Sequence, residues 1–218
     1  MDASPHELRI FPLGEVVLFP DTLLPLHIFE PRYRTMLDDA MADDGRIGMV
    51  LTRTAAPEGG QVHEEDCGMY TVGCAGNVVQ HRRFDDGRSL IVLRGSLRFR
   101  IREELSTDRP YRVASVQPLH EGPPPSEELG AWRQALEASM LRLVAATGGK
   151  VEDVEGLFSK LDPPIMVNYL CASLPVDAVE KQAMLECATP GDRYHKLLEV
   201  LEFRIAEARM GGAGAGEN

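Results

Sequence analysis

Three arginines near the middle of the chain have the spacing of a binding surface. Arg98, Arg100 and Arg102 alternate with apolar residues in the segment LRFRIR. Because successive side chains of a strand point to opposite faces, the three guanidinium groups are expected on one face. Such a face suits an anion or an acidic peptide. The simpler interpretation is a solvated face whose arginines pair with acids such as Glu103 or Asp85, because exposed ion pairs are common.

A second candidate is the motif LLPLHIFEPRYR at residues 23–34. A carboxylate at its centre precedes a predicted helix, where the helix dipole favours negative charge and either nearby arginine could pair with it. The apolar residues could line a peptide groove that takes an added strand, or they could form core. The motif is therefore either a peptide-binding surface or a structural corner, in which the histidine packs and is hydrogen-bonded. Its candidate residues are Leu26, His27, Phe29, Glu30, Arg32, Tyr33 and Arg34.

No motif assigns a catalytic, cofactor-binding or metal-binding residue. The sequence contains no G-x-x-x-x-G-K-[ST] loop, no G-x-S-x-G elbow and no H-E-x-x-H pair. Its 6 histidines are scattered without the spacing of metal ligands. We therefore expect no enzyme activity and no cofactor.

Composition narrows the class of partner. The chain has 218 residues and a formal net charge of -11. Nucleic-acid affinity comes mostly from basic side chains that neutralise phosphates, so this charge disfavours a nucleic-acid partner. No apolar run approaches the roughly 20 residues that span a bilayer, and the opening MDASPHELRIFPL lacks the basic and apolar regions of a signal peptide. We expect a cytoplasmic protein with no membrane partner.

Residues 1–120 are predicted to form a β domain with one inserted helix. Short apolar segments bounded by Gly, Pro or Asp are typical of a barrel or a folded-over sheet. Asp86-Gly87 suits a hairpin turn. Pro31 fits the first position of the helix and Gly45 lies just past its end. The expected strands are 9–11, 16–19, 23–29, 47–52, 71–81, 89–94, 97–102 and 111–116.

Residues 121–210 are predicted to form an all-α bundle. The prolines of HEGPPPSEE indicate a linker before it. Five helices follow, of which the first has an apolar face at spacings of three and four residues. The fourth begins at Asp177, with Glu180 in the position of a capping box. The Gly-rich residues 211–218 are expected to be a disordered tail.

The motif at residues 23–34 resembles the signature of the Lon protease N-terminal domain family. The upstream FPLGEVVLFP is similar to the opening of that family, and GRIGMVL, TVGCAGNVV, DDGRSLIVLRGSLRFRI and PYRVASVQPL are similar to its later strands in order. The segment NYLCASLPVDAVEKQAMLECATPGDRYHKLLEVLE resembles the helical region that follows and the end of stand-alone bacterial Lon-N proteins. The resemblance covers about residues 8–205.

The resemblance implies an α+β fold, in which a PUA-like, mainly antiparallel β-barrel with one inserted helix precedes an all-α bundle. It also implies a non-catalytic module that binds proteins or unfolded peptide segments, without the ATPase and Ser-Lys protease parts of Lon. Two alternatives stay open: an RNA-binding PUA-like protein, and a small hydrolase with an unrecognised site.

Overall fold

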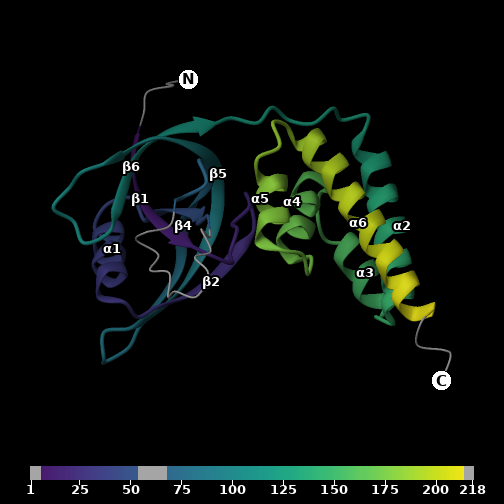
Figure 1. Cartoon of the computed structure of the whole chain (residues 1–218), viewed down its shortest axis with the longest axis horizontal. Helices are drawn as coiled ribbons and strands as arrows, with labels where there is room; N and C mark the ends of the chain where they lie inside the picture. Colours follow the sequence, from purple (N-terminus) through teal and green to yellow (C-terminus); the bar gives the residue numbers. More distant parts are fainter. Residues whose placement is uncertain (1–5, 54–67, 214–218) are drawn as a thin grey trace, which may run out of the picture. The chain divides into compact units, whose positions relative to one another are not determined.

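The computed structural model describes residues 6–53 and 68–213 (Figure 1). The chain divides into two compact units. The first, called here the sheet unit, consists of the described residues up to His120 together with Ala172–Glu186. The second, the helical unit, consists of Glu121–Cys171 and the described residues from Cys187 onward.

The sheet unit holds all six strands. They are β1 (His6–Leu13), β2 (Leu23–Ile28), β3 (Arg46–Leu51), β4 (Val72–Arg83), β5 (Ser89–Leu105) and β6 (Arg112–Leu119). The described residues form six helices: α1 (Pro31–Met41), α2 (Leu129–Thr147), α3 (Val151–Phe158), α4 (Pro163–Ser173), α5 (Ala178–Leu185) and α6 (Pro190–Ala213).

The strands form one mixed sheet. Their order is β2-β5-β4-β3-β1-β6, and β6 also pairs with β5. The ladder of β1 with β3 is parallel, and the other ladders are antiparallel. Because β5 is long, its first half pairs with β2 and its second half with β6, while β4 lies along its other edge. A buried cluster from five strands lies between them: Leu8, Ile10, Val50, Ala75, Phe99, Ala114 and Val116.

Local signals in the sequence placed α1 and the β4–β5 turn correctly. The helix begins at Pro31, and Gly45, with a φ of 71°, donates its N–H to the Ala40 carbonyl at 2.8 Å beyond the helix end. Gly87 has a φ of 81° in the turn that joins β4 and β5. Both glycines adopt the left-handed conformation that they tolerate better than other residues.

Two strand predictions were wrong. Residues 16–19 do not form a strand, although Val17, Leu18 and Phe19 are buried. Thr22 ends this segment, because its hydroxyl donates to the Phe19 carbonyl at 2.8 Å. Residues 89–94 and 97–102 belong to the single strand β5. Gly95 lies within β5 and does not end the strand. Because glycine has no Cβ, the main chain of Phe19 can pass close to β5 at this point; a Cβ at Gly95 would lie 2.0 Å from the Phe19 carbonyl oxygen.

The helical unit is organised around α2 and α6, which lie side by side (Figure 1). Trp132 of α2 stacks on Tyr194 of α6 with ring centroids 4.5 Å apart. Arg193 is 1% exposed, donates to Asn168 Oδ1 at 2.8 Å and forms an ion pair with Glu121. All five helices predicted after residue 126 are present, and the Asp177 N–H donates to Glu180 Oε2 at 3.3 Å as a capping box requires.

The helix α5 groups with the sheet, not with the other C-terminal helices. Gln182 donates to the Val72 carbonyl at 2.9 Å, and Arg98 donates to the Leu185 carbonyl at 2.6 Å. The sheet unit is therefore discontinuous in sequence, which the contiguous ranges 1–120 and 121–210 did not anticipate. The helix α6 continues to Ala213, so the first residues of the expected tail 211–218 are helical and the remainder lies outside the described residues.

Candidate functional site

The strand β2 separates the apolar motif into two faces. Leu24, Leu26 and Ile28 are partly or fully buried, whereas the residues between them are exposed. The partner strand β5 has the same alternation at this end, because Leu90 is exposed and Ile91 and Leu93 are buried. Cross-strand pairs join His27 to Leu90 and Pro25 to Val92. The exposed side also carries the charged Arg94, opposite Leu23. Its residues Leu23, Pro25, His27, Phe29, Leu90 and Val92 are called here the β2–β5 face.

The β2–β5 face exposes large apolar side chains on neighbouring strands. Leu23 is 64% exposed, Phe29 57% and Leu90 44%. The His27 and Phe29 rings lie 5.6 Å apart, and His27 is directly opposite Leu90. His27 itself is exposed, so its interpretation as a packed histidine was wrong. Clusters of exposed apolar side chains are typical of protein-interaction surfaces.

The free edge of β2 is poorly suited to an added strand. The Gly95 N–H donates to the Thr22 carbonyl at 2.9 Å, so the even-numbered residues of β2 point their main-chain groups toward β5. Pro25 is then directed to the free edge, where it has no N–H to donate. Proline at such a position protects an edge strand from pairing with another chain. The exposed side chains of the face, more than the edge, are therefore the candidate contact surface.

The centre of the motif joins β2 to the start of α1. Glu30 is the N-cap residue of α1 and accepts a hydrogen bond from Arg32 Nε at 2.9 Å. The Arg32 guanidinium lies 4.5 Å from the centre of the Tyr33 ring. Tyr33 is buried and packs against Phe11 of β1 with ring centroids 4.2 Å apart. These contacts fix the start of α1 against the sheet.

Arg34 has a different place from the one expected. Its main-chain N–H donates to the Glu30 carbonyl at 2.9 Å, as in the first turn of any helix. Its guanidinium lies against the β4–β5 turn, so close that a Cβ at Gly87 would lie 1.9 Å from Arg34 Nη2. The φ of 81° favours glycine at this position, whereas the flexible end of the Arg34 side chain could shift to admit a Cβ.

The three alternating arginines do not form one solvated face. Arg98 is 3% exposed and is covered by α5 through its hydrogen bond to the Leu185 carbonyl. Arg100 is exposed, and Arg102 is also exposed and donates to Gln117 Oε1. The pattern correctly placed Arg98 opposite the core residue Phe99, but it gave no sign that a helix distant in sequence covers Arg98.

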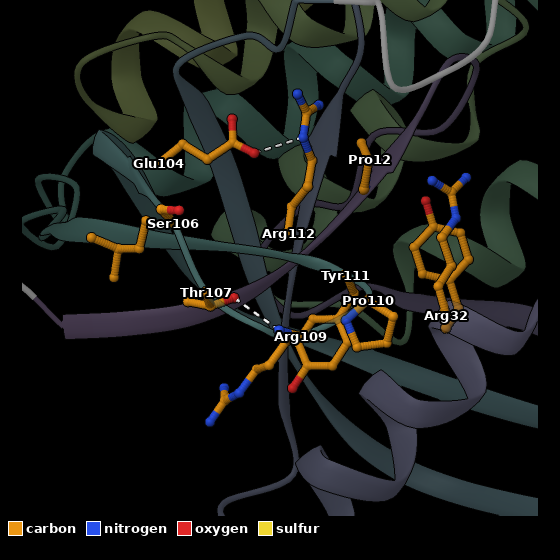
Figure 2. A pocket seen from close by; sticks show the side chains of 11 residues that line it. Pro12, Arg32, Glu104, Ser106, Thr107, Arg109, Pro110, Tyr111 and Arg112 are labelled. Carbon is orange, nitrogen blue, oxygen red and sulfur yellow. Dashed lines mark hydrogen bonds and ion pairs between the residues drawn. The ribbon is translucent and has the colours of Figure 1, made fainter.

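A pocket that the sequence did not reveal lies where β5 turns into β6 (Figure 2). It has a volume of about 290 Å³. Arg112 Nε donates to Glu104 Oε1 at 2.7 Å, and the Arg109 N–H donates to Thr107 Oγ1 at 3.4 Å. Its lining residues are Pro12, Arg32, Tyr33, Glu104, Leu105, Ser106, Thr107, Arg109, Pro110, Tyr111 and Arg112. In the sequence, the polar segment REELSTDRPYR contains most of the residues that line this pocket. Residues of β1 and α1, which are distant in sequence, complete it.

Burial raises the pKa of the Tyr111 phenol, and the hydrogen bond that its hydroxyl donates to Asp39 Oδ2 raises the pKa further. The hydroxyl is thus protonated and already engaged. Tyr111, which is 5% exposed, is therefore a packed residue of the pocket wall whose hydroxyl is used by Asp39.

Two kinds of site are missing from the described part of the chain. Within residues 6–53 and 68–213, no group of three or more His, Cys, Asp or Glu side chains is placed to hold a metal ion. In the same residues, no helix combines the length and the apolar character needed to cross a membrane.

Comparison with known proteins points to one family. Residues 7–202 match the model of the ATP-dependent protease La (LON) substrate-binding domain. The chain is 30% identical over 202 residues to Lon protease 2 of Desulfotalea psychrophila, covering 91% of this chain and 25% of that protein. It is 28% identical over 186 residues to Lon protease 2 of Syntrophobacter fumaroxidans, covering 85% and 23% respectively. The chain thus spans about a quarter of the length of these relatives.

Solved structures share the fold. A Lon N-terminal domain protein from Xanthomonas campestris matches with a TM-score of 0.61 and 22% identity, covering 89% of this chain and 98% of that one. The N-terminal domain of a Mycobacterium avium complex Lon protease matches with a TM-score of 0.65 and 17% identity, covering 92% and 98%. Nearly the whole of each of these domains has a counterpart here.

Proposed function

Because the chain belongs to the family of the ATP-dependent protease La (LON) substrate-binding domain, we propose that it is a non-catalytic module that binds proteins or unfolded peptide segments. The observation that carries this proposal is the β2–β5 face, on which Leu23, Phe29 and Leu90 are exposed; Leu90 lies opposite His27, and Leu23 lies four residues away along β2. An unfolded segment that covers these side chains removes apolar surface from water, which favours association in proportion to the area buried.

Anisotropy of fluorescein-labelled β-casein, an unfolded protein, tests the proposal. We expect the parent chain to bind it and the double variant Phe29→Ser, Leu90→Ser to bind it at least about tenfold more weakly, because burying one large apolar side chain contributes about 1.5–3 kcal/mol. Phe203→Ser is the matched control, since Phe203 of α6 and Phe29 are both 57% exposed. Equal loss of binding in the control would remove the case for the β2–β5 face.

We further propose that strands β5, β4, β3, β1 and β6 close into a PUA-like barrel. The pairing of β6 with both β1 and β5, which returns the order of strands to its start, supports this closure. We also propose, from the family resemblance, that the chain has neither ATPase nor protease activity and works in the cytoplasm. ATP hydrolysis or casein cleavage that co-purifies with the chain and disappears on a point substitution would refute the non-catalytic part.

A further inference from the structure

We propose that the pocket at the β5–β6 turn is a second binding site, one that takes a carboxylate attached to a small apolar group. None of the residues that define the β2–β5 face lines this pocket, so the proposal does not depend on the function of that face. The carboxylate has two possible sources, the C-terminus of a peptide or a free organic acid.

The charge of the pocket selects an anion. Three arginines, Arg32, Arg109 and Arg112, are among its lining residues, and Glu104 is the one acidic lining residue. Guanidinium groups bind carboxylates through paired, charge-assisted hydrogen bonds. A chain with a net charge of -11 that nevertheless gathers three cations around one cavity has concentrated them at this place.

The ion pairs of the pocket favour a single negative charge over two. Arg32 is paired with Glu30 at 2.9 Å, and Arg112 is paired with Glu104 at 2.7 Å. In the described part of the chain, the Arg109 side chain has no carboxylate partner and only approaches the Tyr111 ring, 5.9 Å from its centre. One uncompensated cation matches a monoanion, whereas the nearby Glu104 would repel a dianion such as a phosphate monoester.

The donors of Arg112 are not all used. Its Nε bonds Glu104, but its Nη1 is buried and has no hydrogen-bond partner among the described residues. A buried donor without an acceptor costs free energy. A carboxylate bound within reach of this donor would give it an acceptor.

The walls of the pocket suit an apolar group next to the anion. Leu105 and Pro110 supply the accessible apolar surface, because Tyr33 and Tyr111 are only 3% and 5% exposed and Pro12 is also buried. Ser106 and Thr107 supply hydroxyl groups. A volume of about 290 Å³ holds one apolar side chain and its carboxylate, but not a folded domain.

Two labelled peptides test the proposal with the full chain. Fluorescein–GSGALL with a free C-terminus is expected to bind, and the same peptide with a C-terminal amide is expected to bind at least about tenfold more weakly, because the charge-assisted hydrogen bonds are lost. Arg109→Gln should weaken the acid peptide by a similar factor without a change in melting temperature. The matched control is Arg100→Gln, which removes an exposed arginine of β5 outside the pocket and should leave binding unchanged.

Competition by N-acetyl-leucine separates the two sources. Displacement of the acid peptide by N-acetyl-leucine at an equal concentration assigns the pocket to free organic acids, and failure to displace assigns it to peptide C-termini. Both results support a carboxylate site. The proposal is overturned if the amide binds as tightly as the acid, if Arg109→Gln binds like the parent, or if the acid peptide does not bind at millimolar concentration.

Discussion

The two sides of the β2–β5 strand pair differ sharply although both are rich in apolar residues. On one side Ile28, Ile91 and Leu93 are almost completely buried, and on the other Leu23, Phe29 and Leu90 are among the most exposed large apolar residues of the described chain. An antiparallel sheet with one solvated face usually places polar residues there. Here Arg94 is the charged residue opposite Leu23, and the exposed apolar side chains beside it are the surface that the proposed partner would cover.

The largest expected effect compares the two sides directly. Leu93→Ala removes a side chain that is 0% exposed, and such truncations cost about 2–5 kcal/mol of unfolding free energy. Leu90→Ser, three residues away in the same strand but on the other side, should change that free energy by no more than about 0.5 kcal/mol. Urea denaturation of both variants measures the difference. Equal destabilisation would show that Leu90 is packed and that the β2–β5 face is not a free surface.

A second comparison concerns two arginines of β5, of which Arg98 is covered by α5 and Arg100 is exposed. Arg98→Gln removes the donor to the Leu185 carbonyl, and a hydrogen bond from a charged group contributes about 1.5–3 kcal/mol. We expect a clear fall in the melting temperature, whereas Arg100→Gln, two residues away and exposed, should melt like the parent. If the two variants melt alike, α5 does not depend on Arg98 for its attachment.

A smaller effect is expected from the Glu30–Arg32 pair at the corner of the motif. The two side chains are 36% and 24% exposed, so the pair belongs to the class that contributes about 0.2–1 kcal/mol. Glu30→Gln and Arg32→Gln should each lower the melting temperature slightly, and the double variant should lose less than the sum of the two. Strictly additive losses would mean that the two side chains do not interact in solution.

The smallest effect lies outside both faces and depends on pH. Burial raises the pKa of Asp44, but hydrogen bonds from Arg46 and the charge of Arg9 outweigh it and hold the pKa below its usual value. A lowered pKa in the folded state stabilises the protein above the unfolded value of about 3.9, and this contribution is lost as the pH falls through the folded value. Asp44→Asn should therefore melt slightly below the parent at pH 7, with the gap closing in acid.

Local signals in the sequence predicted the parts of the fold that depend on neighbouring residues. Pro31 and Gly45 marked the ends of α1, Gly87 marked the β4–β5 turn, and the spacing of apolar residues gave the helices. The parts that failed depend on residues distant in sequence. Gly95 was interpreted as a strand end because its role, the crossing of residue Phe19 over β5, leaves no local pattern.

The candidate site divides in the same way. The motif at residues 23–34 was found from the sequence. The alternation of side chains along a strand, however, does not tell which of its two faces is covered by the rest of the protein. Only the tertiary structure shows that Leu90, which was never a candidate, completes the exposed face opposite His27. The pocket was missed because Arg32 of α1 meets Arg109 and Arg112 only after the chain has folded.

Methyl NMR tests the central claim, binding of unfolded protein by the β2–β5 face, most directly. The full chain, labelled with 13C at the leucine methyl groups, is titrated with unlabelled β-casein. The account predicts that the signals of Leu23 and Leu90 shift or broaden, while those of buried Leu93 and of Leu136 in the helical unit stay unchanged. Saturable casein binding that leaves Leu23 and Leu90 unperturbed would contradict it.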